Sequence, residues 1–437
     1  MIVAALLLLP AALSAQEYKY VTDGAPNLKR PDPPQRVADV ETAKGFEEVL
    51  FIVHKGAALL AKPGLDLGWK LGLLGVGGGP PGGFRGNIGG SGPKSGTGIT
   101  LGYVYYSQPF WTGIEGAVTY KLYTEDSAWL GVTDPTYENF LRAIVTYDLD
   151  RHDEFSGLGM ETECVDRVDC SPENEETDYY QEEFRVLGEG RVRLGEGFYL
   201  GGRGGYRKMN ILKGKNDDIP DITKVFGDVF LPGVGVLPGV SGENADYTQA
   251  GGYLLLDTRD VPGNPSRGLL LSGGYDIFRG VSDTPFDWNR YSAELAGYIP
   301  IPDASRTIAV RIFAVHQDPE NDETVVPYYS LSSIGGPSLL RSYDSQRFSD
   351  NDMAYAAIEY RRRVWTHPEG WYAVDAALVA ESAAVYRDMF DDFSLSDMKQ
   401  SFGTEARLLT PNNTDVRLGC SFGDEGGKFF VSGGGRF

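Results

Sequence analysis

Apolar and polar residues alternate along most of the chain from residue 97 onward. The stretch that begins at Thr97 reads TGITLGYVYYSQPFWTGIEGAVTYKLY, two alternating runs on either side of a turn near Ser107–Pro109. Successive side chains of a β-strand point to opposite faces, so an alternating run places its apolar side chains on one face. Similar runs recur up to the end of the sequence. The pattern predicts an all-β structure over residues 97–437.

The segments between the expected strands alternate between short and long. Short turns such as GEG and TPNNTD alternate with long acidic segments at residues 151–180, 211–246 and 318–327. Short turns at one end of a sheet and long loops at the other are typical of β-barrels that cross a bacterial outer membrane. Closing the sheet into a barrel also removes exposed strand edges. We therefore expect a transmembrane antiparallel β-barrel of about sixteen strands.

The segment FFVSGGGRF at the end of the sequence is one further expected strand. One of its faces carries Phe429, Val431 and Phe437, with Gly433 and Gly435 between them. Such a strand resembles the closing strand of outer-membrane barrels, where it is the signal for membrane insertion. The glycines either make the strand easy to distort or only fit a kinked strand end.

The sequence before residue 97 follows other patterns. Residues 1–15 are an apolar run that ends in small residues, which is typical of a signal peptide. This run is shorter than the roughly 20 residues of a membrane-spanning helix. Residues 39–62 repeat apolar side chains at helical spacing and predict one amphipathic helix, packed either on other parts of the protein or on a membrane surface. The rest of residues 16–96 is rich in proline and glycine.

The composition suits a barrel and argues against one class of partner. Glycine accounts for 57 of the 437 residues, with 25 Tyr and 21 Phe, which fits strands that alternate lipid-facing and lumen-facing side chains. A secreted all-β protein would have a similar composition. The formal net charge of −21 argues against nucleic acid as a partner, because no basic region is concentrated enough to neutralise phosphates.

The chain has three cysteines. Cys164 and Cys170 lie close together in an acidic segment, and in an exported protein this spacing predicts a small disulfide loop. A metal site is the alternative, but no histidine is near the two thiols in the sequence. We expect Cys420, in a strand, to be a free thiol that is buried or faces lipid. We expect no metal and no cofactor.

The sequence offers little for an enzyme. Its four histidines, His54, His152, His316 and His367, lie far apart and lack the spacing of metal ligands. No GxSxG nucleophile motif is present. Carboxylates are abundant, but abundance carries no signal in a chain with 61 acidic residues. We expect no enzymatic activity.

Longer motifs add a family resemblance. Residues 257–278, DTRDVPGNPSRGLLLSGGYDIF, resemble a strand–turn–strand segment of the BamA/TamA-type outer-membrane proteins, also called bacterial surface antigens. Residues 334–364 resemble the loop of that family that folds back into the barrel lumen, followed by a strand with Glu-x-Arg. Residues 373–381 resemble the next strand, with a lumen-facing Asp. The strand–turn motif consists of Asp257, Arg259, Asp260, Pro265 and Gly268.

The resemblance implies a role for one arginine of the lumen loop. Arg341 would reach acidic residues on the two strands that follow, here Glu359 and Asp375. An arginine inside a barrel stays charged and needs a carboxylate partner. The alternative is a surface loop in which Arg341 makes no specific pair. The family pattern has Gly after this arginine and then an aromatic residue, whereas this chain has Ser342 and Tyr343, so we expect the loop to dock slightly differently.

The resemblance also implies a function and partners. Family members that assemble or secrete proteins carry periplasmic POTRA domains, each a βααββ unit. Residues 16–96 show no such pattern, so we expect a short member with a barrel and no POTRA domain. The family inserts or translocates proteins or lipids at the bacterial outer membrane. Outer-membrane lipids, unfolded outer-membrane proteins and a periplasmic or lipoprotein partner are the partners that follow from this.

Three functions remain open from the sequence. The first is insertion or translocation through a weak seam between residues 97–107 and 428–437. The second is a passive or structural outer-membrane pore, plugged by residues 334–353 or by the helix at 39–62. The third is a secreted soluble β-rich protein.

Overall fold

The computed structural model describes the chain from residue 83 onward, with gaps. The described residues are 83–90, 97–105, 114–121, 125–133, 139–160, 177–213, 221–222, 230–231, 235–236, 239, 245–260, 264–281, 284–301, 305–321, 323–367, 373–409 and 415–433. Outside them lie the expected signal peptide (1–15), the expected helix (39–62), Cys164, Cys170, Gly435 and Phe437.

One antiparallel sheet of sixteen strands makes up most of the described structure. Its strands pair with one another in chain order. They are β1 (Gly83–Gly90), β2 (Thr97–Tyr105), β3 (Ile114–Lys121), β4 (Glu125–Thr133), β5 (Phe140–Phe155), β6 (Thr177–Gly195), β7 (Phe198–Lys213), β10 (Ala245–Asp257), β11 (Gly268–Gly280), β12 (Trp288–Ile301), β13 (Arg306–Pro319), β16 (Asp352–Thr366), β17 (Ala373–Tyr386), β18 (Lys399–Leu409), β19 (Asp415–Gly423) and β20 (Gly426–Gly433). The prediction of an all-β fold built on a large antiparallel sheet is confirmed.

Small elements lie in the connections between these strands. Two short hairpins are formed by β8 (Phe230–Leu231) with β9 (Gly235–Val236), and by β14 (Ser332–Ile334) with β15 (Phe348–Asp350). The described helices include the 3₁₀ helix η2 (Tyr328–Ser330) and α4 (Met389–Asp392). Within the described part of the chain, no helix is long and apolar enough to cross a membrane.

The sheet begins earlier than the alternating pattern of the sequence suggested. β1 lies in the glycine-rich segment before residue 97 and pairs with β2, from Gly83 opposite Val104 to Gly90 opposite Thr97. The segment reads GFRGNIGG. Glycine has no side chain that could contribute to an alternation of apolar and polar positions, so the pattern missed this strand.

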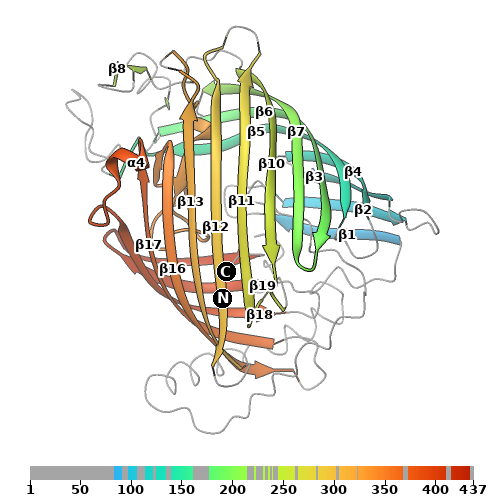
Figure 1. The fold of residues 1–437 in the computed structure, drawn as a ribbon, viewed down its shortest axis with the longest axis vertical. Coiled ribbons are helices and arrows are strands. Elements are labelled where there is room, and N and C mark those ends of the chain that lie inside the picture. The colour runs from blue at the N-terminus through green and yellow to red at the C-terminus, as the bar shows by residue number, and fades with distance from the viewer. Residues whose placement is uncertain are drawn as a thin grey trace.

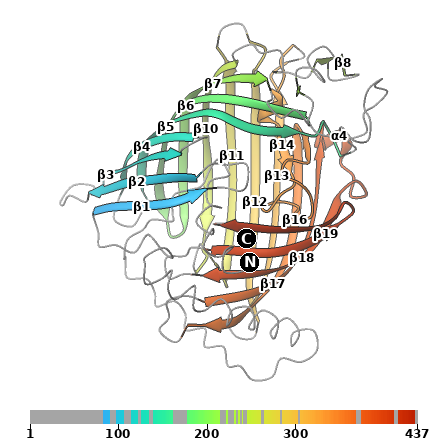
Figure 2. The ribbon, with the colours of Figure 1, turned by 180° about the vertical axis from the view of Figure 1, so that it is seen from behind.

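The strands form a curved wall (Figure 1). β10 to β13 run along its length, and the strands nearest the two ends of the chain curve round to the same side, where β1 and the C-terminal strands are seen together (Figure 2). Among the strand pairings of the described residues, none joins β1 to β20. Within the described residues, β1 and β20 are therefore the two edge strands of the sheet.

The connections differ in length between the two ends of the wall. The longest are residues 156–176, 214–244 and 320–351, which follow β5, β7 and β13. These three strands run in the same direction, because neighbouring strands of the sheet are antiparallel. We call the end that carries these connections the loop end, and the opposite end the turn end.

Side chains alternate between the two faces of the wall. In β12, Leu295 and Ile299 are exposed, whereas Glu294, Ala296 and Tyr298 are buried. The exposed positions on the outer face are apolar in other strands as well: Leu141, Val145, Val186, Leu254, Leu271, Val310, Ile312 and Ile358. The buried positions face the inside of the curve and mix apolar with charged residues. An apolar outer face with a polar inner face is the arrangement of a membrane barrel.

The connection between β13 and β16 packs against the inner face of the wall. It contributes Ile334, Leu339, Leu340, Tyr343 and Phe348 to one buried apolar cluster. The wall contributes Tyr253, Tyr298 and Tyr355 to the same cluster. A second cluster contains Val326 and Tyr328 of this connection together with Trp288 and Tyr247 of the wall. The connection is therefore held inside the curve by apolar burial as well as by polar contacts.

We predict that the outer face of β12 contacts lipid. Leu295→Arg, near the middle of the strand, should lower the free energy of unfolding in lipid vesicles by about 2–4 kcal/mol, the cost of a cation at mid-bilayer depth. Asp318→Arg, at an exposed position near the loop end of β13, is the control and should cost far less. Reversible urea unfolding measures both. Equal costs for the two variants would contradict a lipid-facing β12.

Candidate functional site

Residues 335–347, which we call the lumen loop, form a compact coil between β14 and β15. The amide of Gly335 donates to the carbonyl of Leu339 at 3.0 Å, and the amide of Gly336 donates to the carbonyl of Tyr343 at 3.0 Å. Gly335 has a φ of +119°, and a Cβ there would lie 2.1 Å from the carbonyl oxygen of Asp344. Only glycine fits this turn, which folds the loop back on itself.

Arg341 lies at the buried tip of the lumen loop, where its side chain is 2% exposed. Its Nη1 lies 2.6 Å from Oε1 of Glu381 on β17, and its Nε lies 2.7 Å from Oε1 of Glu405 on β18. Its backbone amide also donates to Oε2 of Glu381 at 2.8 Å. Tyr355 on β16 donates to Oε1 of Glu381 at 2.6 Å. Burial alone would lower the pKa of Arg341, but Glu381 and Glu405 outweigh it and hold that pKa above its ordinary value.

The partners expected from the sequence, Glu359 and Asp375, are wrong for Arg341. Asp375 forms an ion pair with Arg363 instead. It lies six residues before Glu381 on β17, which is about 20 Å along a strand, so the loop does not reach it from the loop end. Glu359 is occupied by other arginines. The prediction named β17 correctly but took β16 for β18, and it placed the loop at the wrong depth.

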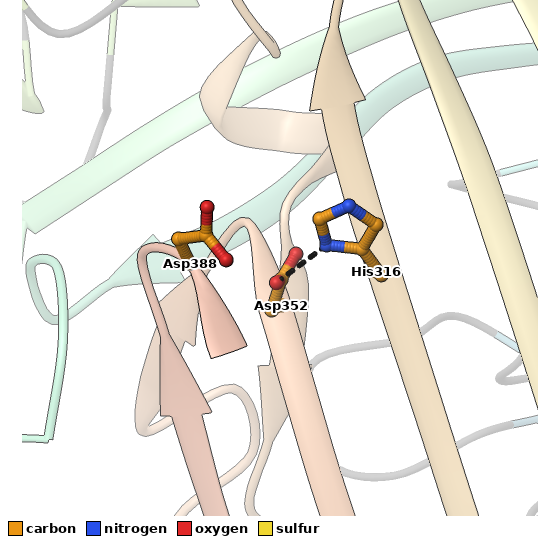
Figure 3. A group of neighbouring side chains, drawn as sticks. All are labelled: His316, Asp352 and Asp388. Atoms are coloured by element: carbon orange, nitrogen blue, oxygen red, sulfur yellow. Dashed lines mark hydrogen bonds and ion pairs between the residues drawn. The ribbon is translucent and has the colours of Figure 1, made fainter. Parts of the chain in front are cut away.

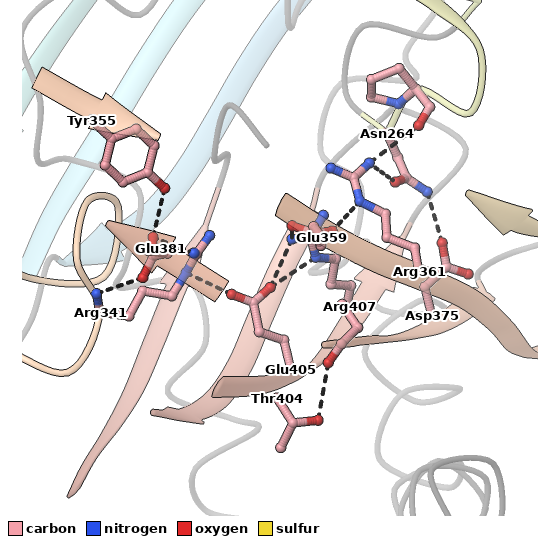
Figure 4. A network of polar contacts seen from close by, with 12 residues as sticks. Asn264, Arg341, Tyr355, Glu359, Arg361, Asp375, Glu381, Thr404, Glu405 and Arg407 are labelled. Carbon is pink, nitrogen blue, oxygen red and sulfur yellow. Dashed lines mark hydrogen bonds and ion pairs between the residues drawn. The ribbon is translucent and has the colours of Figure 1, made fainter. Parts of the chain in front are cut away.

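An unbroken row of alternating charges continues from Arg341 (Figure 4). Glu405 also binds Arg407, Nη2 to Oε2, at 2.8 Å. The same Nη2 of Arg407 lies 2.5 Å from Oε2 of Glu359, and Glu359 pairs in turn with Arg361. We call these five residues, in the order Arg341, Glu405, Arg407, Glu359 and Arg361, the charge row. Each of their side chains is at most 2% exposed, so each charge depends on its neighbours in the row.

The charge row ends on the turn between β10 and β11. Arg361 Nη1 donates to Asn264 Oδ1 and to the carbonyl of Pro265, both at 3.2 Å. Asn264 Nδ2 donates in turn to Oδ2 of Asp375 at 2.9 Å. Asn264 is buried, so this turn reaches the inner face from the turn end. The charge row thus joins a loop from one end of the wall to a turn from the other.

The residues of the strand–turn motif shape this turn. Arg259 pairs with Asp257, Nη2 to Oδ2, at 2.7 Å. Asp260 accepts the backbone amide of Ser266 at 2.9 Å, which closes the turn around Pro265. Gly268 has a φ of +112°, and a Cβ there would lie 2.4 Å from the carbonyl oxygen of Thr258. The motif therefore presents Asn264 and Pro265 to the charge row.

Ser342 fits because of a glycine on another strand. It is fully buried, and its amide donates to Oγ of Ser401 at 3.2 Å. A Cβ on Gly423 at the end of β19 would lie 2.3 Å from Oγ of Ser342. The next residue, Tyr343, accepts the amide of Asp424 at 3.3 Å. The serine that departs from the family pattern is therefore accommodated by the missing side chain at position 423.

Two ion pairs join the lumen loop to the last hairpin. Lys428 on β20 lies 2.7 Å from Asp344, Nζ to Oδ2. Arg347 lies 2.9 Å from Glu425, Nε to Oε1, in the turn between β19 and β20. Both pairs are more exposed than the charge row. They connect the loop to the strand that forms the C-terminal edge of the sheet.

The described part of the last strand has the expected faces. Phe429 and Val431 are exposed, whereas Phe430 between them is buried. Cys420 on β19 lies opposite Phe429 and is a free thiol.

One group of candidate metal ligands escaped the sequence reasoning. His316 on β13, Asp352 on β16 and Asp388 before α4 bring their ligand atoms within 4.8 Å of one another (Figure 3). They come from three separate elements, so their spacing in the sequence does not indicate a metal site. Asp352 accepts hydrogen bonds from Nδ1 of His316 at 2.7 Å and from the amide of Gln317 at 2.8 Å. These contacts engage Nδ1 of His316 and both carboxylate oxygens of Asp352.

We predict that Arg341→Ala lowers the free energy of unfolding by about 3–5 kcal/mol, because it removes the cation that binds the buried Glu381 and leaves the buried Glu405 with Arg407 alone. Arg347→Ala is the matched control in the same loop. Its partner Glu425 is partly exposed, so this variant should cost about 1 kcal/mol or less. Urea unfolding in vesicles measures both. If the two variants cost the same, the buried pairs do not hold the loop.

We predict energetic coupling between Ser342 and Gly423. Gly423→Ala should destabilise the protein by about 1–3 kcal/mol, because its methyl group meets Oγ of Ser342. The double variant Ser342→Gly with Gly423→Ala should recover part of this loss. Recovery should be partial, because a Cβ at position 423 also meets the carbonyl of Gln400. Gly273→Ala, at a strand position with open space, is the control. Additive effects in the double-mutant cycle would disprove the contact.

Comparison with known proteins supplies a family. Residues 238–418 match the model of the Omp85 superfamily domain. No curated protein matches the chain. Among solved structures, BamA from Haemophilus ducreyi lacking POTRA domains 1–3 is similar at 12% identity with a TM-score of 0.53, over 82% of this chain and 70% of that chain. CdiB from Escherichia coli is similar at 12% identity with a TM-score of 0.49, over 81% of this chain and 62% of that chain.

The 12% identity to BamA shows a shared fold alone, so the family rests on the domain match. The matched residues include β10 to β13, β16 to β18, the lumen loop and every member of the charge row. Omp85 barrels reside in the bacterial outer membrane, in agreement with the apolar outer face of this wall. Residues 238–418 of this chain therefore belong to an Omp85 superfamily domain, the kind of barrel that resides in the bacterial outer membrane.

Proposed function

We propose that this chain is an outer-membrane barrel that aids the insertion or translocation of proteins or lipids at the outer membrane. The sixteen strands of its sheet would close the barrel, and the lumen loop would block the interior. The Omp85 superfamily is a family of protein assembly and translocation factors. The two motifs at residues 257–278 and 334–364 favour the BamA/TamA group within it.

The observation that carries this proposal is the way the lumen loop is held. Arg341 binds two buried carboxylates, and the apolar side chains around it are packed against the wall. A loop fixed by desolvated ion pairs on the inner wall works against a steadily open pore, because such a pore needs a wide, hydrated passage. The outer-membrane domain argues against the secreted soluble protein that the sequence left open.

The two edge strands of the sheet, β1 and β20, support the proposal of a seam, that is, a weak junction between the first and last strands. β1 and β20 each have eight residues, the sequences GFRGNIGG and GGKFFVSG, and glycine weakens a strand. By contrast β16 has fifteen residues and β17 fourteen. We propose that substrates engage the wall between β1 and β20. The insertion signal at the end of the chain would comprise Phe429, Val431, Gly433, Gly435 and Phe437.

The proposal implies a limited set of partners. Outer-membrane lipids would surround the wall. Unfolded outer-membrane proteins or lipids would be the substrates, and a periplasmic protein or a lipoprotein would deliver them. Neither a cofactor nor an enzymatic step is part of the proposed activity.

We predict that an unfolded substrate contacts the β20 edge. A photoreactive amino acid at Ser432 of β20 should crosslink to a urea-denatured outer-membrane barrel protein while that protein inserts into vesicles containing the chain. Ser292, an inward-facing serine in the middle of the wall, is the matched control and should crosslink far less. Analysis of the crosslinked products by mass spectrometry measures both. Equal crosslinking at the two serines, or none at either, would contradict a seam at β20.

Conductance separates the proposal from the passive pore. In planar bilayers the wild-type chain should stay closed, because the lumen loop blocks the interior. A steady open conductance of the wild type would favour the passive pore instead.

A further inference from the structure

The segment between β17 and β18 turns back over the outer face of the wall. Asp352, the first residue of β16, shares the outward-facing side of that strand with Ile358, which is 52% exposed. Asp352 is nevertheless fully buried. The start of the segment between β17 and β18 covers Asp352, because the amide of Met389 donates to Oδ2 of Asp352 at 2.8 Å. The segment therefore lies outside the wall, opposite to the lumen loop.

His316 fastens the same segment from the neighbouring strand. It belongs to the outward-facing side of β13, which it shares with Val310 and Ile312. Its Nδ1 donates to Oδ2 of Asp352 at 2.7 Å. The edge of its ring meets Phe390 of α4, with 4.8 Å between ring centroids.

The cluster of His316, Asp352 and Asp388 acts as a tether. Asp352 accepts from His316, from the amide of Gln317 and from the amide of Met389. Asp388 accepts the amide of Phe390 at 2.9 Å, which caps α4. His316 and Asp352, which Figure 3 shows bonded to each other beside Asp388, are thus engaged in bonds that hold the segment. A metal would have to displace these bonds, so the cluster carries no metal proposal.

The tethered segment presents apolar side chains to its surroundings. Phe390 is 77% exposed, Phe393 54% and Leu395 74%. Large apolar side chains gathered at such exposure mark an interaction surface. The segment also carries exposed carboxylates, among them Asp391 and Asp392, so it is not apolar throughout.

This surface continues a row of aromatic side chains on the outer face. Tyr275 on β11 and Tyr291 on β12 are exposed, with their ring centroids 4.9 Å apart. Tyr291 stacks on His316 at 5.8 Å, and His316 meets Phe390. The row crosses β11, β12 and β13 in their loop-end halves. Aromatic side chains gather at this level of a membrane barrel, where the lipid headgroups begin.

We propose that residues 388–397 form a membrane anchor. Phe390, Phe393 and Leu395 insert into the interfacial layer of the leaflet at the loop end, and the His316–Asp352 pair holds the segment at that depth. The occupant of the surface is the lipid bilayer, because the surface is continuous with the apolar outer face of an outer-membrane domain. The inference rests on that placement and is independent of the substrate of the barrel.

Depth-dependent quenching tests the anchor. Phe390→Cys, Phe393→Cys and Leu395→Cys, each in a background with Cys164→Ser, Cys170→Ser and Cys420→Ser, carry an environment-sensitive fluorophore. The full chain is reconstituted into phosphatidylcholine vesicles whose lipids bear a nitroxide near the headgroup or deep in the acyl chain. Glu323→Cys, an exposed position in the long connection at the same end, is the control, and the background without an added cysteine is the blank.

The expected result is a several-fold stronger quenching by the shallow nitroxide at the three anchor positions than at position 323. Quenching by aqueous iodide should show the opposite order. Anchor labels that iodide reaches as easily as position 323 would overturn the proposal. Labels shielded from both quenchers would overturn it as well, because a protein surface would then cover the segment.

A second measurement tests the tether. His316→Ala and Asp352→Asn should each reduce lipid quenching of the label at position 395 and increase iodide quenching. Asp391→Asn, which removes a carboxylate of the same segment from outside the tether, should change neither. Heat-modifiable migration on gels confirms that each variant is folded. If folded His316→Ala and Asp352→Asn leave the label unchanged, the tether has no part in the depth of the segment.

Discussion

The described structure depends on a single electrostatic constraint, the neutralisation of arginines that are cut off from water. Arg341, Arg361 and Arg407 are each at most 2% exposed, and arginine does not give up its charge at any accessible pH. Each must therefore sit beside a carboxylate, and each carboxylate beside an arginine. The alternating order of the charge row satisfies both demands. It leaves the lumen loop one docking position, where Glu381 and Glu405 can both reach Arg341.

The same constraint specifies how the strands align. Glu359 and Arg361 lie on β16, and Glu405 and Arg407 lie on β18, all on the inward side. Sliding one strand by a single residue would turn its pair toward lipid and leave the other half of the row without counter-charges. The row also joins segments that are distant in the chain, since Arg341 of the lumen loop is one end of it and Asn264 contacts the other end. Correct strand register, turn and loop thus support one another.

Much of the fold could be predicted from the sequence, because the alternation of apolar and polar residues along a strand shows which side chains share a face. The exposed Phe429 and Val431 beside the buried Phe430 follow this rule. Pairing inside the barrel could not be read, because a chain with 61 acidic residues offers many carboxylates to each arginine. Choosing Glu381 over Asp375 requires knowing how deep the loop reaches. The contact of Ser342 with Gly423 could not be predicted from the local sequence, since the two residues lie close together only in the folded protein.

Rigid and compliant parts of the wall can be told apart by the same reasoning. The charge row binds β16 and β18 together through Arg407, and Arg341 adds β17 through Glu381. β16 also carries Asp352 on its outer side, so the anchor segment is fastened to the same strand. Separating these strands would expose unpaired charges to a membrane interior, at a cost of several kcal/mol. The proposed seam at the glycine-containing edge strands β1 and β20 lies outside this row, so opening there would leave its buried charges paired.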